Sequence, residues 1–114
     1  MKAVQITSYD GPLGTLEYGE TSDPTPAAGQ IAINVHYAGV SYVEALFAGG
    51  FVPTIPVPWV PGLEASGTVR AYGEGVTEHD GLEIGTPVAA FTVTDSGGYG
   101  QIAVTNAHLV APIP

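Results

Sequence analysis

The segment QIAINVHYAG, from Gln30 to Gly39, has the clearest secondary-structure pattern in this sequence. Larger apolar side chains alternate with smaller or polar ones, and successive side chains of a β-strand point to opposite faces. The pattern therefore predicts a strand with two distinct faces. One face carries Ile31, Ile33, Val35 and Tyr37, and the other carries Ala32, Asn34, His36 and Ala38.

Shorter segments of the same kind lie on both sides of this strand. Sixteen glycines and ten prolines divide the 114 residues into short pieces, which argues against long helices. The length is typical of one domain, and many short strands with closely spaced turns predict a mainly β fold, either a barrel or a sandwich. The further expected strands are Lys2–Thr7, Thr15–Glu20, Glu64–Gly73, Thr86–Thr94 and Tyr99–Asn106.

One segment, SYVEALFAGG from Ser41 to Gly50, has the signals of a helix. Ser41 is suited to the N-cap, and Glu44 occupies the N3 position of a capping box. Gly49 and Gly50 are typical of a helix C-terminus. The sequence therefore predicts one short helix directly after the central strand.

The charge balance limits the classes of partner. Two Lys and Arg residues stand against eleven Asp and Glu residues, a formal net charge of −9. So few cations cannot neutralise many phosphates, which argues against nucleic acid and anionic membranes as partners. Charged residues make up 11% of the chain, against about 25% in an average domain. We therefore expect part of the surface to be covered by another domain, a subunit or a cofactor.

The chain contains no cysteine, which excludes disulfides, thiolate nucleophiles and cysteine-bound zinc. No signal-peptide pattern follows Lys2, and no apolar run approaches the roughly 20 residues of a membrane helix. We expect a soluble, cytoplasmic protein.

Four segments occur together in the order and spacing of one known family. They are MKAVQITSYDGP (residues 1–12), AGVSYVEALFAGG (38–50), VPGLEASGTVRAYGEGV (60–76) and GGYGQIAVTNAHLVAPIP (97–114). The chain resembles the N-terminal, GroES-like domain of medium-chain dehydrogenases/reductases, in particular the zinc-independent quinone-oxidoreductase branch. This resemblance covers residues 1–114 and implies a partly open β-barrel with one short helix. It also implies that the chain is a fragment of a two-domain enzyme.

The resemblance also implies a function. The GroES-like domain would form the substrate side of a cleft in an oxidoreductase that reduces quinones, enones or similar conjugated carbonyls by hydride transfer. NADPH or NADH would be bound mainly by a C-terminal Rossmann domain that is missing from this chain, since no strand–GxGxxG–helix pattern occurs in it. The 114 residues are not expected to be active alone, and a homodimer is one possible assembly of the full-length protein. The alternative is a stand-alone GroES-like binding or assembly module without catalysis.

The resemblance further bears on metal binding. Zinc-dependent relatives place Cys at the position of Ser41 and His at the position of Leu63, with the acid of the same motif at Glu64. A catalytic zinc needs about three nitrogen, sulfur or oxygen ligands from the protein. Leu63 offers none of these, and a serine hydroxyl is a poor substitute for a thiolate. We therefore expect no zinc. The three histidines, His36, His79 and His108, are too scattered to suggest another metal site.

Seven residues are candidates for the cleft or its support. Ser41 is either only the helix N-cap or also a hydrogen-bonding partner of a nicotinamide ribose or a substrate carbonyl. Glu44 is expected to serve the capping box, and Glu64 to support the site unless it is simply solvated. Leu63 is either an inward-packed turn residue or part of an apolar cleft wall. The cleft candidates are Ser41, Tyr42, Leu46, Phe51 and Leu63, and the supporting residues are Glu44 and Glu64.

The zinc-free branch commonly carries Asn, Asp, Tyr and Arg where this chain has Ser41, Glu44, Leu46 and Ala48. Their replacement makes the cleft more apolar and weakens any transfer of quinone specificity. Several apolar side chains around the proline-rich segment 52–61 either form a wall for a flat substrate or pack as ordinary core. They are Leu46, Phe47, Phe51 and Trp59. The same segment also has the composition of a polyproline ligand, but its position between patterned strands argues against that role.

Overall fold

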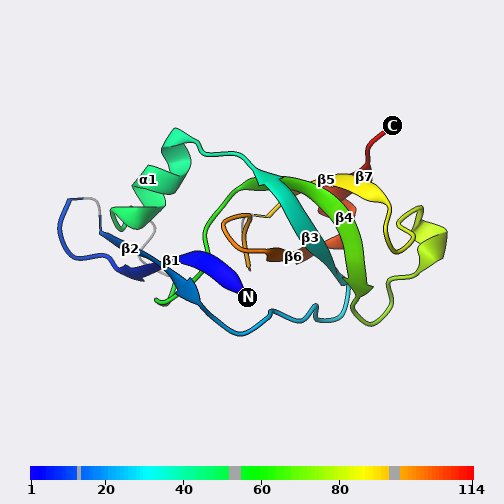
Figure 1. The fold of residues 1–114 in the computed structure, drawn as a ribbon, viewed down its shortest axis with the longest axis horizontal. Coiled ribbons are helices and arrows are strands. Elements are labelled where there is room, and N and C mark those ends of the chain that lie inside the picture. The colour runs from blue at the N-terminus through cyan, green and yellow to red at the C-terminus, as the bar shows by residue number, and fades with distance from the viewer. Residues whose placement is uncertain (13, 52–54, 93–95) are drawn as a thin grey trace.

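The computed structural model of the chain describes residues 1–12, 14–51, 55–92 and 96–114. In these residues the fold is mainly β with a single α-helix, as the sequence predicts (Figure 1). The strands are β1 (Lys2–Ser8), β2 (Thr15–Glu20), β3 (Gln30–Ala38), β4 (Glu64–Tyr72), β5 (Pro87–Phe91), β6 (Ile102–Asn106) and β7 (Val110–Pro112). The helix is α1 (Tyr42–Ala48), and two short 3-10 turns are η1 (Glu78–Asp80) and η2 (Ala107–Leu109).

The strands form two antiparallel sheets. Five of them pair in the order β6-β3-β4-β5-β7, and β1 pairs with β2 in a small separate sheet. The larger sheet is open, because its end strands β6 and β7 do not pair with each other. Helix α1 lies beside the small sheet, at the opposite end of the molecule from β5 and β7 (Figure 1).

The central strand β3 is buried on both faces in its first half. Ile31 and Ile33 are fully buried in the main core with Val69, Leu82, Val88 and Ala90. Ala32, on the opposite face, packs with Ile102 and Val104. The pairing with β4 shifts register between Ala32 and Ile33 and again between Val35 and Tyr37, and Tyr37 is 78% exposed. The predicted alternation therefore marks a core face only up to Ile33.

The small sheet is joined to the rest of the fold through β1. Ile6 is fully buried and exchanges backbone hydrogen bonds with Trp59, and the Val4 N–H donates to the Tyr99 carbonyl. All six residues of β2 are exposed, including Leu16 and Tyr18. The alternation in β2 therefore does not identify a buried face.

The other predicted elements differ mainly at their ends. The strand expected at Thr86–Thr94 is observed as Pro87–Phe91. Residues 93–95 of that prediction and residues 52–54 of the proline-rich segment are not among the residues that the structure describes. The strand expected from Tyr99 begins at Ile102, because residues 97–99 bond instead to the turn at residues 60–62. None of the helices in the described part of the chain has the length and hydropathy needed to span a membrane.

Candidate functional site

Helix α1 begins with the predicted capping box. Ser41 is the N-cap, in extended conformation, and both its backbone N–H and its hydroxyl donate hydrogen bonds to Glu44 Oε2. The backbone N–H lies 2.9 Å from that oxygen. Gly49 follows as the C-cap, and Gly50 has a positive φ of 82°, as the sequence predicts for the helix end.

The Glu44 carboxylate also bonds outside its own helix. Its second oxygen, Oε1, accepts from the backbone N–H of Leu63 at 3.2 Å. Burial of the side chain, which is 4% exposed, opposes ionisation. The hydrogen bonds from Ser41 and Leu63 outweigh that effect and lower the Glu44 pKa below its ordinary value. Glu44 is thus an ionised, buried link between the helix and the turn before β4, and we name Ser41, Glu44 and Leu63 the carboxylate link.

The turn that carries Leu63 is held by close backbone packing. Gly62 has φ +119°, and a Cβ added there would lie 2.5 Å from the Gly98 nitrogen. The buried Thr92 hydroxyl donates to the Gly62 carbonyl at 2.6 Å. The Tyr99 N–H donates to the Pro61 carbonyl at 3.1 Å. This packing fixes where Leu63 and Glu64 leave the turn and enter β4.

Tyr99 is a neighbour of the carboxylate link that the sequence did not single out. Partial burial of its phenol and the negative charge of Glu44 raise the Tyr99 pKa. Its place between Gly98 and Gly100 was the only signal in the sequence, and the hydrogen bonds that bring this segment to residues 60–62 are seen only in the structure.

The proline-rich segment packs against α1 through aromatic side chains. Phe47 and Trp59 form an edge-to-face pair with ring centroids 5.9 Å apart and an interplanar angle of 67°. Trp59 Nε1 donates to the Tyr9 hydroxyl at 2.8 Å, and this hydroxyl donates to the Ile55 carbonyl at 2.7 Å. These two rings therefore pack internally, whereas Phe51 is 74% exposed.

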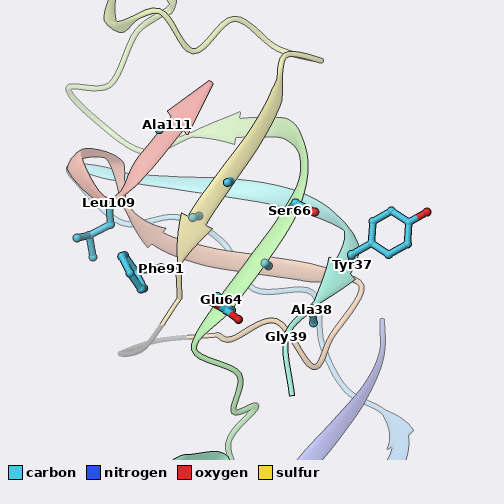
Figure 2. Close-up of a pocket in the computed structure, with 11 residues that line it drawn as sticks. Tyr37, Ala38, Gly39, Glu64, Ser66, Phe91, Leu109 and Ala111 are labelled. Atoms are coloured by element: carbon cyan, nitrogen blue, oxygen red, sulfur yellow. The ribbon is translucent and has the colours of Figure 1, made fainter. Parts of the chain in front are cut away.

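A groove of about 610 Å³ lies over the sheet next to the carboxylate link. Its floor consists of small side chains on adjacent strands, with Tyr37 at one end and Phe91 and Leu109 at the other (Figure 2). The Glu64 carboxylate lies over Gly39, where a Cβ would overlap it. The lining residues are Tyr37, Ala38, Gly39, Glu64, Ala65, Ser66, Ala89, Ala90, Phe91, Leu109 and Ala111.

Comparison with known families gives the same assignment as the fold. The model of the alcohol dehydrogenase GroES-like domain matches residues 27–114, most of the chain. The chain belongs to this family.

Similar proteins lie in the quinone-oxidoreductase branch of the medium-chain dehydrogenase/reductase superfamily. The chain is 30% identical over 115 residues to quinone oxidoreductase of Rattus norvegicus. It is 31% identical to a synaptic vesicle membrane protein VAT-1 homolog-like protein of Mus musculus. Each match covers the whole chain but only 34% and 26% of the respective relative, so the chain spans about a third of such proteins or less.

Solved structures agree with this placement. A mycobacterial quinone oxidoreductase superposes with a TM-score of 0.87 at 31% identity, over all of this chain and 34% of the other. A mycobacterial structure described as complexed with NADPH gives a TM-score of 0.86 at 30% identity, again over all of this chain and 34% of the other.

Within this GroES-like domain, three of the seven predicted site residues come together, one lines the groove, and Tyr42, Leu46 and Phe51 do neither. Ser41, Glu44 and Leu63 come together in the carboxylate link. Of the seven candidates, Glu64 alone lines the groove. Tyr42 is 77% exposed near the start of α1, and Leu46 is half-buried in the same helix. The carboxylate link and the groove are neighbours along the chain, because Leu63 of the link precedes Glu64 of the groove, and Gly39 of the groove lies two residues before Ser41 of the link.

Most of the groove lining was missed from the sequence. Tyr37, Ser66, Ala89, Phe91 and Ala111 are strand residues with solvent-facing side chains, but alternation along β3 places Tyr37 on the face of the buried Ile31 and Ile33, and only the register shifts in β3 turn it outward. The pairing order of the strands, which brings them side by side, was not available from the pattern. No group of three or more His, Cys, Asp or Glu residues with metal-binding geometry occurs in the described residues.

Proposed function

We propose that this chain is the substrate-side domain of an NAD(P)H-dependent oxidoreductase that reduces quinones, enones or similar conjugated carbonyls without zinc. The observation that supports it most directly is the carboxylate link. At the two positions where zinc-dependent relatives carry Cys and His, this chain has a serine hydroxyl that donates to Glu44 and a leucine whose N–H does the same.

The donor set at these positions does not fit zinc. Leu63 has a hydrocarbon side chain, and the Ser41 hydroxyl is already directed to Glu44. Both Glu44 oxygens accept hydrogen bonds from Ser41 and Leu63, so binding a metal would break the link that holds the helix to the turn. The site can instead orient a substrate through shape and hydrogen bonding.

The residues present fit part of a nicotinamide cofactor. Ser41, an exposed member of the carboxylate link, and Tyr42, the exposed residue next to it, suit contacts to a nicotinamide ribose or an acceptor carbonyl. Neither of the two cations, Lys2 and Arg70, lines the groove, and Arg70 bonds to Asn34 at 2.9 Å. The pyrophosphate therefore calls for the further domain implied by the length of the relatives.

When bound, NADPH would supply a hydride to the conjugated acceptor, and a solvent proton would complete the reduction. This chain would contribute an apolar wall from Leu46 and Leu63 and exclude water around the acceptor. Glu44 would act as a positioning residue, because its low pKa keeps it ionised and unsuited to donate a proton. We place the reaction in the cytoplasm, in keeping with a chain that has no cysteine.

The test is NADPH oxidation by the full-length protein with a small quinone and with an enone, each with and without a strong chelator. We expect oxidation that depends on the acceptor and is unaffected by the chelator. Loss of activity on chelation that zinc restores would overturn the zinc-free proposal. A full-length protein that neither binds nor oxidises NADPH or NADH would overturn the reductase proposal.

A further inference from the structure

Met1 is held in the fold by both its backbone and its side chain. Its amino group donates a hydrogen bond to the Thr21 carbonyl at 2.6 Å, and the Thr21 N–H donates to the Met1 carbonyl at 2.9 Å. The Met1 side chain is 2% exposed, and its Sδ accepts from the Ile102 N–H at 3.4 Å. The same side chain packs against the cluster of Ala32, Ile102 and Val104. Met1 thus connects the end of β2 with β6.

The positive charge of the Met1 amino group is matched by a carboxylate. Asp23 Oδ1 lies 2.8 Å from the nitrogen, and Glu20 Oε2 lies 3.8 Å from it. The hydrogen bond from this amino group, and its charge, lower the Asp23 pKa. The ammonium therefore donates to both Thr21 and Asp23, and it joins the start of β1 to the segment that follows β2.

Removal of Met1 would not reproduce these contacts. The next nitrogen along the chain, that of Lys2, donates to Gln101 Oε1 at 2.9 Å and so has a different partner from the Met1 nitrogen. A Cβ added at Gly100 would lie 2.8 Å from Met1 Cε, because the end of the methionine side chain lies against that glycine. Loss of Met1 would leave this space empty and would move the ammonium away from Asp23.

An acyl group on the Met1 nitrogen would also break the arrangement. An amide nitrogen is uncharged and carries one N–H, so it cannot donate to both Thr21 and Asp23. The Asp23 carboxylate would lose the opposite charge beside it. Hydrogen bonds to charged groups are worth more than those between neutral groups, so the loss would fall on the stronger of the two contacts.

We propose that the free ammonium of Met1 is a structural group of this domain, which anchors the β1–β2 sheet to β6 only when Met1 is retained and unacylated. A class of reaction that must precede complete folding follows from this. Where synthesis leaves a formyl group on Met1, water must cleave the amide bond. Formate leaves with the oxygen of the water, and the nitrogen takes up both protons of the water to become the ammonium.

The experiment is hydrogen–deuterium exchange, followed by mass spectrometry, on the full-length protein in two forms. One form begins at Met1 with a free amino group. The other keeps a Gly-Ser dipeptide before Met1 after cleavage of a purification tag, which turns the ammonium into a peptide nitrogen. Protein acetylated at Met1 by a co-expressed N-terminal acetyltransferase provides a third sample.

We expect peptides that cover residues 17–23 and 100–106 to exchange several-fold faster in the extended and acetylated forms, because the Thr21 and Ile102 N–H groups bond to Met1. Peptides from β4 should exchange equally in all forms, since none of the Met1 contacts involves that strand. Equal exchange of residues 17–23 and 100–106 in all three forms would overturn the proposal.

Asp23→Asn separates the effect of the charge from crowding by the added residues. In the form that begins at Met1 it should speed exchange of residues 17–23 several-fold. In the extended form it should add little, because the ammonium is already absent. The contact between Asp23 and Arg70, at 4.0 Å between exposed side chains, contributes little in either form.

Glu83→Gln, which changes an exposed acid before β5, is the matched control and should leave the exchange of residues 17–23 unchanged. If the effects of Asp23→Asn and of the extension added fully, the extension would be acting by crowding, and the role of the Met1 charge would be wrong.

Discussion

The Glu44 carboxylate accepts a hydrogen bond from the backbone N–H of Leu63 at 3.2 Å, across nineteen positions of the chain. The same carboxylate caps its own helix through Ser41. One buried side chain thus fixes α1 relative to the turn that opens β4. The position of the candidate cleft depends on this contact, because one oxygen of the Glu44 carboxylate holds Ser41 and the other holds Leu63.

Glu44→Gln is expected to destabilise the chain by about 1–3 kcal/mol, the usual cost of leaving a buried hydrogen-bonding group unsatisfied. An amide offers one acceptor oxygen, whereas both oxygens of Glu44 accept from N–H donors. Whichever way the Gln amide is turned, its NH2 group faces the backbone N–H of either Ser41 or Leu63, and two donors cannot form a hydrogen bond with each other. Urea unfolding measures the change.

The matched control is Glu74→Gln, an exposed acid whose change should fall within about 0.5 kcal/mol. Equal effects at the two positions would contradict the role given to Glu44.

The pH dependence of stability should carry the signature of Glu44. Its pKa is lowered in the folded chain because the hydrogen bonds from Ser41 and Leu63 outweigh the effect of burial. A carboxyl with a lowered folded-state pKa contributes stability above its unfolded-state pKa, and this contribution is lost as the pH falls through the folded-state value. We expect the stability difference between wild type and Glu44→Gln to shrink in that acidic range and to be constant near neutral pH. Urea titrations at several pH values check this.

Much of the architecture could be predicted from local patterns. The capping box at Ser41 and Glu44 and the glycines after Ala48 defined the helix, because capping depends on residues only three or four positions apart. The alternation around Ile31 and Ile33 located the central strand. The Leu63 contact and the pairing of Tyr37, Ser66, Ala89 and Ala111 along the groove could not be predicted in this way. They join residues far apart in sequence, and they follow from strand order and register shifts that no local pattern encodes.

Gly62→Ala should destabilise the chain more than Gly75→Ala. Both glycines have positive φ, +119° and +85°, so an alanine is strained at either position. At Gly62 a Cβ would also meet the Gly98 and Tyr99 nitrogens, at 2.5 and 2.9 Å, whereas at Gly75 nothing lies within 4 Å. We expect about 1 kcal/mol for Gly75→Ala and at least twice that for Gly62→Ala.

Both variants carry backbone strain, and Gly62 lies farther from the left-handed region than Gly75, so the additional cost of Gly62→Ala combines this larger strain with the contact between the two turns. Urea unfolding of each variant is the measurement. A cost for Gly62→Ala no larger than that of Gly75→Ala would show that residues 97–99 move away freely, which the hydrogen bonds between these turns argue against.

Tyr9→Phe should weaken the attachment of the proline-rich segment to α1. The Tyr9 hydroxyl accepts a hydrogen bond from Trp59 Nε1 and donates one to the Ile55 carbonyl. Removing the hydroxyl leaves both groups without this partner. The expected cost is about 1–2 kcal/mol, with the Phe47–Trp59 ring contact retained. Trp59 is the only tryptophan in the sequence, so its fluorescence follows both the local change and the unfolding. Tyr18→Phe, in the exposed strand β2, removes a hydroxyl from a side chain that is 71% exposed and should leave emission and stability unchanged. If Tyr9→Phe matched this control in both measurements, the Tyr9 hydroxyl would not be holding Trp59 in place.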